Sequence, residues 1–317
     1  LCSVRDAEAE LARANRIGVQ LIAQGERGYP PALTHADGSP PLIYVKGRPE
    51  LADMPIVSIV GARNGSAAGQ KFTRHIANVL GIEGFVLASG LARGIDTAAH
   101  NASLDMGTIA VVAGGIDIVY PPENEALQEA IATRGLLISE RPPGFIPRAK
   151  DFPRRNRLIS GIALGAVVVE AAQRSGSLIK ARIAGEQGRE VFAVPGSPLD
   201  PRASGTNNLI KQGARVVTDP KDIIDSLAPI LGRPTNGARN ELCSNEGQNV
   251  RGPLPHIAQT DRERVIQALG PSPIEIDEII RCTGLETRKV HIILLELDLT
   301  GRLQRHGRQL VSLVDAF

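Results

Sequence analysis

The chain contains no tryptophan, and aromatic residues make up only 3% of its 317 residues. An extended aromatic platform that stacks many bases is therefore not expected. The three cysteines, Cys2, Cys243 and Cys282, are far apart, so neither a disulfide framework nor a cysteine metal site is predicted. No apolar run reaches the length of a membrane span, and no basic-then-apolar signal pattern opens the sequence. We expect a soluble protein of the reducing cytoplasm with no membrane partner.

Common catalytic and cofactor motifs are also missing. No Gly-Lys-Ser/Thr sequence follows a glycine loop, which argues against a Walker A site and ATP hydrolysis. The first loop has glycines at 61, 65 and 69 rather than in G-x-G-x-x-G spacing, and this disfavours NAD. No H-E-x-x-H, G-x-S-x-G or Cys/His metal pattern occurs. We therefore predict no enzyme activity, no catalytic residue, no cofactor and no metal.

The order of apolar segments predicts an α/β fold in several parts. Residues 1–50 read as a small helical (SAM-like) unit, with a helix or helix pair over 7–24 and a short strand at 42–45. Residues 51–228 alternate apolar strands with helices, which is typical of a Rossmann-like, doubly wound, mostly parallel sheet. Residues 229–259 are rich in Gly, Pro and Asn and predict a flexible linker.

Residues 260–317 predict a separate winged-helix domain, because three helical patterns are followed by a small hairpin. From Asp261 to Phe317 there are nine acidic and eight basic residues, a net charge of −1. A domain that reads DNA usually presents a basic face. We therefore favour protein contact or an accessory role for this domain over reading of the major groove.

The segment DFPRRNRLIS, from Asp151 to Ser160, places three arginines around an asparagine directly after Phe152. Arginine has a fixed charge and a planar fork that matches phosphate oxygens, and phenylalanine offers a face on which a base can stack. Since the formal net charge of the chain is only +2, nucleic-acid binding depends on such local clusters. Two interpretations are open: a groove for a polyphosphate with bases, or a solvated loop with surface arginines.

Glycine-rich turns follow several predicted strands at their carboxyl ends, where open α/β sheets bind ligands. These turns are Gly61–Ser66, Ser89–Gly94, Ala113–Gly115, Ser175–Ser177 and Pro195–Ser197. Small residues let backbone N–H groups approach a phosphate, and helix amino termini add partial positive charge. Tight turns favour glycine in any case, but five turns with Arg63 and Arg93 among them indicate an anion-binding groove.

Two titratable residues have more than one interpretation. His100 follows Asp96 by four residues in a predicted helix, and we favour a hydrogen bond in the core or a helix-surface pair over catalysis. Glu170 ends a predicted strand near the arginine cluster. It either pairs with an arginine or acts as an acid or base, and we favour pairing.

Seven segments together resemble the DNA-processing protein A (DprA or Smf) family of bacterial natural transformation. They are IVSIVGARNGSAAG from Ile56, LASGLARGIDTAAH from Leu87, TIAVVAGGIDIVYPPEN from Thr108, LLISERPPG from Leu136, DFPRRNRLISG from Asp151, VVVEAAQRSGSLIKARIAGEQGREVFAVPGSP from Val167 and GTNNLIKQGA from Gly205. Each segment alone is modest, and their number and order make the resemblance specific.

The resemblance implies a homodimer that binds single-stranded DNA without strong sequence preference, protects incoming DNA and loads the RecA recombinase, without being an enzyme. Lys180 stands where the family more often has threonine, so it either adds a phosphate contact or is a neutral surface change. The DNA-binding residues expected from the resemblance and the arginine pattern are Arg63, Ser89, Gly90, Arg93, Phe152, Arg154, Arg155, Asn156, Arg157, Ser175, Gly176, Ser177 and Lys180.

Two other functions stay open. A nucleotide-processing Rossmann-fold enzyme of the phosphoribohydrolase type would carry a P-G-G-x-G-T loop followed by glutamate, and the nearest segment here, residues 174–178, lacks that spacing. A transcription regulator would read DNA with the winged helix while the sheet senses a ligand. The acidic balance of the last domain counts against that function.

Overall fold

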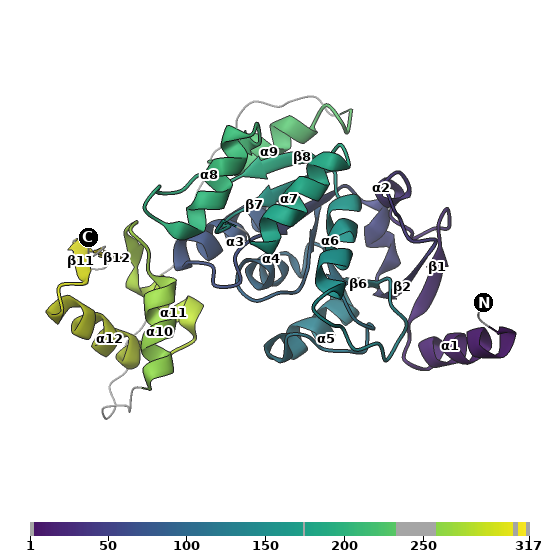
Figure 1. The fold of residues 1–317 in the computed structure, drawn as a ribbon, viewed down its shortest axis with the longest axis horizontal. Helices are drawn as coiled ribbons and strands as arrows, with labels where there is room; N and C mark the ends of the chain where they lie inside the picture. Colours follow the sequence, from purple (N-terminus) through teal and green to yellow (C-terminus); the bar gives the residue numbers. More distant parts are fainter. Residues whose placement is uncertain (1–2, 174, 233–257, 307–309, 315–317) are drawn as a thin grey trace. The chain divides into compact units, whose positions relative to one another are not determined.

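Apolar strands that alternate with helices build one large sheet in the first part of the chain (Figure 1). The computed structural model describes residues 3–173, 175–232, 258–306 and 310–314. The chain divides into two compact units, Leu1–Ile223 and Ile224–Phe317. The first unit holds the sheet, and the second holds a smaller helical domain.

Nine strands of the described residues lie side by side in the order β1-β2-β6-β5-β4-β3-β7-β8-β9. All neighbours from β6 to β9 are parallel, whereas β1 and β2 pair antiparallel and β2 joins β6 antiparallel. The strands are β1 Gln20–Ala23, β2 Leu42–Gly47, β3 Ile56–Val60, β4 Val86–Ser89, β5 Thr108–Val112, β6 Leu136–Ser139, β7 Gly165–Val168, β8 Glu190–Ala193 and β9 Arg215–Val216.

Helices cover both faces of this sheet because its strands are apolar on both sides. In β5, Ile109 and Val111 face one core and Ala110 and Val112 face the other. One core includes residues of α6 and α7, and the other includes residues of α1 and α5. The helices are α1 Val4–Arg16, α2 Pro31–Thr34, α3 Ala67–Ile82, α4 Ile95–Ser103, α5 Glu125–Arg134, α6 Asp151–Gly161, α7 Gly176–Glu186, α8 Ser204–Lys211 and α9 Pro220–Leu227. A parallel sheet buried on both faces matches the fold class predicted from the sequence.

The chain changes direction at the centre of the sheet. It runs outward from β3 through β4 and β5 to β6, and then returns to place β7 on the other side of β3. The turns after β3 and β7 therefore meet at the carboxyl edge of the sheet, and this switch point is where ligands bind in open α/β folds.

The predicted helix over 7–24 is wrong beyond Arg16. Gly18, with φ of 69°, interrupts the helix, and Gln20–Ala23 forms β1 and pairs with β2. Ile22 is buried against the sheet, so this short apolar run belongs to a strand. Periodicity does not separate strand from helix over so few residues. Residues 1–50 thus contribute the edge strand β1 and its neighbour β2 as well as α1 and α2.

The second unit has the winged-helix arrangement. Helices α10 Gln259–Ala268, α11 Ile276–Thr283 and α12 Thr287–Leu299 precede a hairpin of β11 Leu303–His306 and β12 Leu310–Leu313. The short β10, Ile274–Glu275, completes an antiparallel sheet in the order β10-β12-β11. This result confirms the predicted domain type. Of the linker predicted over 229–259, residues 233–257 lie outside the described residues.

None of the helices within the described ranges is both long enough and apolar enough to span a membrane.

Candidate functional site

The turns after β3 and β7 are joined by side-chain hydrogen bonds at the switch point. Ser177 Oγ donates to the carbonyl oxygen of Gly61 at 2.7 Å. Glu170 accepts a hydrogen bond from the backbone N–H of Ser66 at 2.8 Å and another from the Ser66 hydroxyl. The Glu170 carboxylate therefore occupies the amino end of α3, where positive partial charge favours an anion. Glu170 is a structural residue, as we favoured, but its partner is a serine and not an arginine.

The amino end of α7 is open in contrast to that of α3. Ser175 is the N-cap residue of α7, yet its side chain makes no capping hydrogen bond. Its hydroxyl oxygen is buried and has no partner among the described residues. Gly176 is exposed, and a Cβ atom at this position would meet nothing within 4 Å. An anion can therefore approach the first N–H groups of α7 closely.

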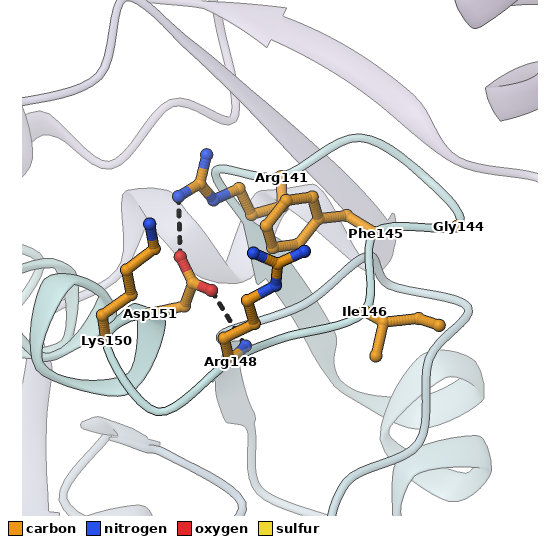
Figure 2. A pocket seen from close by; sticks show the side chains of 7 residues that line it. All are labelled: Arg141, Gly144, Phe145, Ile146, Arg148, Lys150 and Asp151. Carbon is orange, nitrogen blue, oxygen red and sulfur yellow. Dashed lines mark hydrogen bonds and ion pairs between the residues drawn. The ribbon is translucent and has the colours of Figure 1, made fainter.

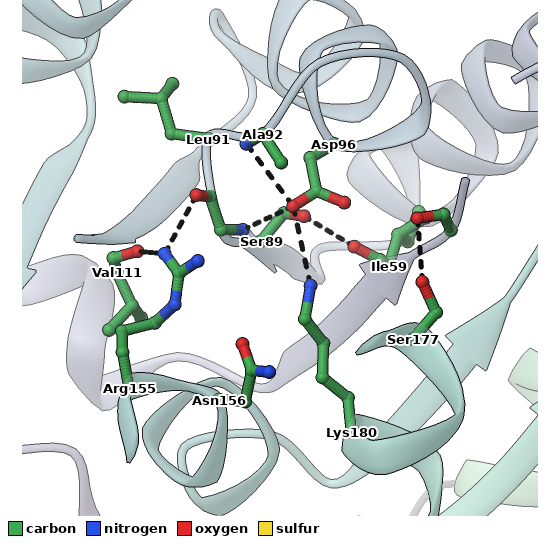
Figure 3. Close-up of polar contacts among 12 residues, drawn as sticks. Ile59, Ser89, Leu91, Ala92, Asp96, Val111, Arg155, Asn156, Ser177 and Lys180 are labelled. Carbon is green, nitrogen blue, oxygen red and sulfur yellow. Dashed lines mark hydrogen bonds and ion pairs between the residues drawn. The ribbon is translucent and has the colours of Figure 1, made fainter. Parts of the chain in front are cut away.

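The turn after β4 is held by buried polar side chains (Figure 3). Asp96 Oδ2 accepts hydrogen bonds from the N–H groups of Gly90 at 3.2 Å and Ala92 at 3.4 Å. His100 Nε2 accepts from the Leu91 N–H at 3.3 Å, and Asn124 donates to the Leu91 carbonyl oxygen at 2.9 Å. These bonds hold Leu91 at φ of 54°, a left-handed conformation that is uncommon for a side chain other than glycine.

The N–H groups of Gly90, Leu91 and Ala92 are therefore committed to internal hydrogen bonds and are not presented to a phosphate. Gly90 lacks a side chain because a Cβ atom there would collide with Arg155 and Asp96. Gly61 and Gly65 are similarly crowded by Ile95. The glycine turns at the ends of β3 and β4 reflect close packing, which the sequence pattern alone did not distinguish from phosphate binding.

Beneath the turn lies a cluster of buried charges, Asp96, Arg155 and Lys180, shown in Figure 3. Arg155 donates to the carbonyl oxygens of Gly90, at 2.8 Å, and of Val111. The ammonium of Lys180 lies 3.6 Å from Asp96 Oδ2. The cluster thus ties α4, α6 and α7 to the carboxyl ends of β4 and β5.

Arg63, exposed in the turn after β3, lies within electrostatic range of this cluster. Burial lowers the pKa of Arg155 to about 10, with Asp96 opposing the shift and the charge of Arg63 adding to it. Burial also lowers the pKa of Lys180, again against Asp96 and with help from Arg155 and Arg63. Three basic side chains therefore lie within electrostatic range of one another, and Asp96 is the one carboxylate that stabilises the buried two, which makes this edge of the sheet attractive to an anion.

The predicted arginine cluster is divided by a helix. Since α6 begins at Asp151, neighbouring residues point in different directions: Arg154 is exposed while Arg155 is buried. Arg154 and Arg157 both pair with the Glu140 carboxylate, at 2.8 Å and 2.6 Å. The segment is therefore neither a loop nor a uniform surface cluster.

The predicted DNA-binding residues fall into three groups by exposure. Exposed at the edge are Arg63, Arg93, Arg154 and Gly176. Partly buried are Phe152, Arg157 and Ser175. Buried are Ser89, Gly90, Arg155, Asn156, Ser177 and Lys180. Among the exposed arginines, Arg93 pairs with Glu123. Among the buried residues, Ser89 donates its hydroxyl hydrogen bond inward to the Ile59 carbonyl oxygen at 2.6 Å.

Tyr120 is a candidate site residue that the sequence reasoning missed. Its ring lies 4.9 Å from the ring of Phe152, centroid to centroid, and the residue is 49% exposed. The segment Thr108–Asn124 was read only as a family match and a glycine turn. A lone tyrosine five residues after that turn carries no signal of its own, so only the fold places it against α6.

The titration of His100, next to the buried cluster, makes the stability of the fold depend on pH. Burial, which outweighs the attraction of Asp96, lowers the pKa of His100 to about 4. The unfolded chain binds this proton below about pH 6.5, whereas the folded chain does not until about pH 4. We therefore expect acidification from pH 6.5 to 4 to remove about 3 kcal/mol of stability through this one residue.

Urea unfolding at about pH 7 and pH 4.5 tests this prediction on the parent and on His100→Gln, which keeps a polar side chain without this titration. The variant should lose less stability than the parent between the two pH values, because all other groups titrate in both proteins. Equal losses would show that His100 is already protonated in the fold.

Comparison with known proteins identifies clear relatives. Residues 20–228 match the family described as DNA recombination-mediator protein A, and residues 251–307 match the DprA winged helix domain. The chain is 36% identical to Protein Smf of Escherichia coli (strain K12) over 94% of this chain and 78% of that protein. It is 44% identical to DNA processing protein DprA of Streptococcus pneumoniae over 62% of this chain and 70% of that protein.

Two solved structures share the sheet. The X-ray structure of DNA processing protein A from Streptococcus pneumoniae has a TM-score of 0.65 and 40% identity, covering 69% of this chain and 77% of that chain. The DNA processing protein A of Helicobacter pylori has a TM-score of 0.61 and 29% identity, covering 67% of this chain and 96% of that chain. The latter structure concerns the single-stranded DNA binding mode of that protein.

Proposed function

Because this chain belongs to the family of DNA recombination-mediator protein A, we propose that it binds single-stranded DNA without reading the base sequence. The strand lies along the carboxyl edge of the sheet, at the switch point between β3 and β7. The relative from Helicobacter pylori supports the ligand class, since its structure concerns the binding of single-stranded DNA.

The observation that carries this proposal is the excess of basic side chains at the switch point. Arg63 is exposed, while Arg155 and Lys180 are buried and lie within electrostatic range of both Arg63 and the Asp96 carboxylate. The buried pair contributes positive potential without touching the strand, and Arg63 makes the direct contact with a phosphate. Charges fixed in a protein interior are screened less than surface charges, so their field reaches the ligand.

A second phosphate position follows from the open amino end of α7. Ser177 holds this helix against the turn after β3, which also carries Arg63. Gly176 leaves the space free, and the first N–H groups of the helix are oriented for an anion. Arg63 and α7 together contact the backbone, which is the same for every base sequence.

Tyr120 and Phe152 supply the stacking surface for the bases. The two rings pack on each other, and Tyr120 keeps an exposed face. Stacking on an aromatic ring tolerates any base, because every base has a π face. Basic groups that contact the DNA backbone, together with one aromatic pair, suit a protein that binds single strands of any sequence.

We propose further that the chain acts as a homodimer in the cytoplasm, protects incoming DNA and loads RecA during natural transformation, by binding rather than by catalysis. Family membership supports these roles. We assign DNA binding to residues 51–228, and an accessory role to the winged helix of residues 260–317. Nuclease protection of the bound strand, and RecA filament assembly with and without this protein, measure the two activities directly.

The first test is fluorescence anisotropy of a labelled oligothymidylate, titrated with protein at several salt concentrations. We expect tight binding that weakens steeply with salt and resists both duplex DNA and a nucleoside monophosphate as competitors. Displacement by the mononucleotide would support a nucleotide-processing enzyme instead. No binding at any salt concentration would contradict the proposal.

The same titration with Tyr120→Leu tests the stacking surface. The variant should bind about 1–3 kcal/mol more weakly, while its salt dependence stays that of the parent because no phosphate contact is lost. Ile82→Leu, an exposed apolar substitution at the end of α3 without loss of an aromatic ring, is a suitable control for surface disturbance.

A further inference from the structure

We propose that a basic groove after β6 binds an additional nucleotide of the same strand, outside the switch point. The groove has a volume of about 640 Å³ and lies between the end of β6 and the start of α6 (Figure 2). The residues that line it include Arg141, Phe145, Arg148, Lys150 and Asp151. The inference rests on the proposed function, because it extends the path of a bound single strand.

The charge of the groove is positive because its one carboxylate is used internally. Asp151 is buried and accepts hydrogen bonds from the Arg141 guanidinium at 2.8 Å and from the Arg148 N–H at 2.9 Å. The N–H of Arg148 is the largest cause of the lowered pKa of Asp151, so this carboxylate stays ionised and occupied. The side chains of Arg148 and Lys150 are exposed and remain available to a phosphate.

The groove also offers an apolar surface for a base. The Arg141 guanidinium lies over the Phe145 ring, 4.5 Å from its centroid, and so leaves a flat, cationic wall. Ile146, next along the loop, is 73% exposed. Flat aromatic and guanidinium surfaces beside free cations are the combination that binds a nucleotide in single-stranded nucleic acid.

The groove wall is fixed before any ligand arrives. The Phe145 carbonyl oxygen accepts from the Gly115 N–H at 2.9 Å, which ties the loop after β6 to the turn after β5. A Cβ atom at Gly114 would collide with Pro147 and with the Phe145 carbonyl, so the two segments pack closely. A preorganised wall loses little conformational entropy on binding.

The groove adjoins the proposed stacking surface along the chain. Asp151, at its inner end, is the first residue of α6, and Phe152 follows it and packs on Tyr120. A strand that stacks a base on Tyr120 and Phe152 therefore reaches Arg148 and Lys150 with its next backbone positions. This adjacency favours the same DNA strand over an acidic peptide as the occupant.

The test compares two oligothymidylates, of about 4 and about 15 nucleotides, on the double variant Arg148→Ala/Lys150→Ala. The short strand should bind the variant as it binds the parent, because the switch point is intact. The long strand should bind about tenfold or more weakly, with a salt slope reduced by about 1.4 for two lost phosphate contacts. Arg134→Ala/Lys211→Ala removes the same charge from positions that precede β6 and β9, at the opposite edge, and should change neither affinity.

The variant Phe145→Leu distinguishes the contribution of base stacking from that of the phosphate contacts. It should weaken the long strand alone and leave the salt slope unchanged, because only stacking is lost. Unchanged binding of the long strand by the double variant would overturn the proposal, as would an equal loss for both strands. Failure of the proposed function has a different signature, since the parent protein would then bind neither strand.

Discussion

Arg155→Met is expected to lower the free energy of unfolding by about 2–5 kcal/mol, whereas Arg154→Ala should change it by less than about 0.5 kcal/mol. Arg155 is buried and donates to the carbonyl oxygens of Gly90 and Val111. Methionine fills much of the same volume but leaves both carbonyls without a donor. The side chain of Arg154 is 52% exposed, so its removal leaves no buried polar group without a partner. Urea unfolding followed by circular dichroism measures both values.

The outcome decides between a structural and a direct role for Arg155. If Arg155→Met is as stable as the parent and yet binds DNA poorly, Arg155 is a DNA contact and the buried assignment is wrong. Arg155→Lys adds a second comparison, because it keeps the charge but cannot reach both carbonyls with a planar fork. It should recover part of the lost stability.

Arg63→Ala is expected to weaken binding of single-stranded DNA about five- to tenfold near 0.1 M salt, with a salt slope reduced by about 0.7. Arg63 is the exposed one of three basic side chains, and its charge acts on the buried Arg155 and Lys180. Arg93→Ala, on the neighbouring turn, should cost less than about twofold, because Arg93 already pairs with Glu123. Both arginines are exposed, so neither change should alter folding.

Anisotropy titrations across salt concentrations separate these two arginines. Equal effects of the two substitutions would mean that the field of the buried cluster does not concentrate binding at Arg63. A loss of affinity for Arg63→Ala without a change in salt slope would point to a packing role rather than a phosphate contact.

The sheet was predictable from the sequence because its strands carry a strong signal. Continuous apolar runs such as Ile56–Val60 and Thr108–Val112 are buried on both faces, and only parallel sheets between helices need such runs. The seven matching segments predicted the family, which the match over residues 20–228 confirms. The strand at Gln20–Ala23 was missed because four residues are too few to show a period.

The sequence predicted which residues belong to the candidate site, but not which of their side chains face solvent and which face the core. The sequence places Arg154 and Arg155 side by side, and only the phase of α6 shows that one faces solvent and the other the core. The buried cluster depends on Asp96, which reaches Lys180 across 84 positions of the sequence. No local pattern records such a contact, since it arises from tertiary packing alone.

Glu140 should affect how fast a strand binds to and leaves the outer part of the proposed interface. Its carboxylate holds Arg154 and Arg157 together, so a phosphate that reaches these arginines exchanges places with an anion already present. The affinity gained there is the difference between two ion pairs rather than the full strength of one. The departing strand likewise leaves no bare cations behind, because the carboxylate returns as the phosphate goes. An internal competitor of this kind favours rapid exchange at the rim, which would assist the proposed transfer of the strand to RecA.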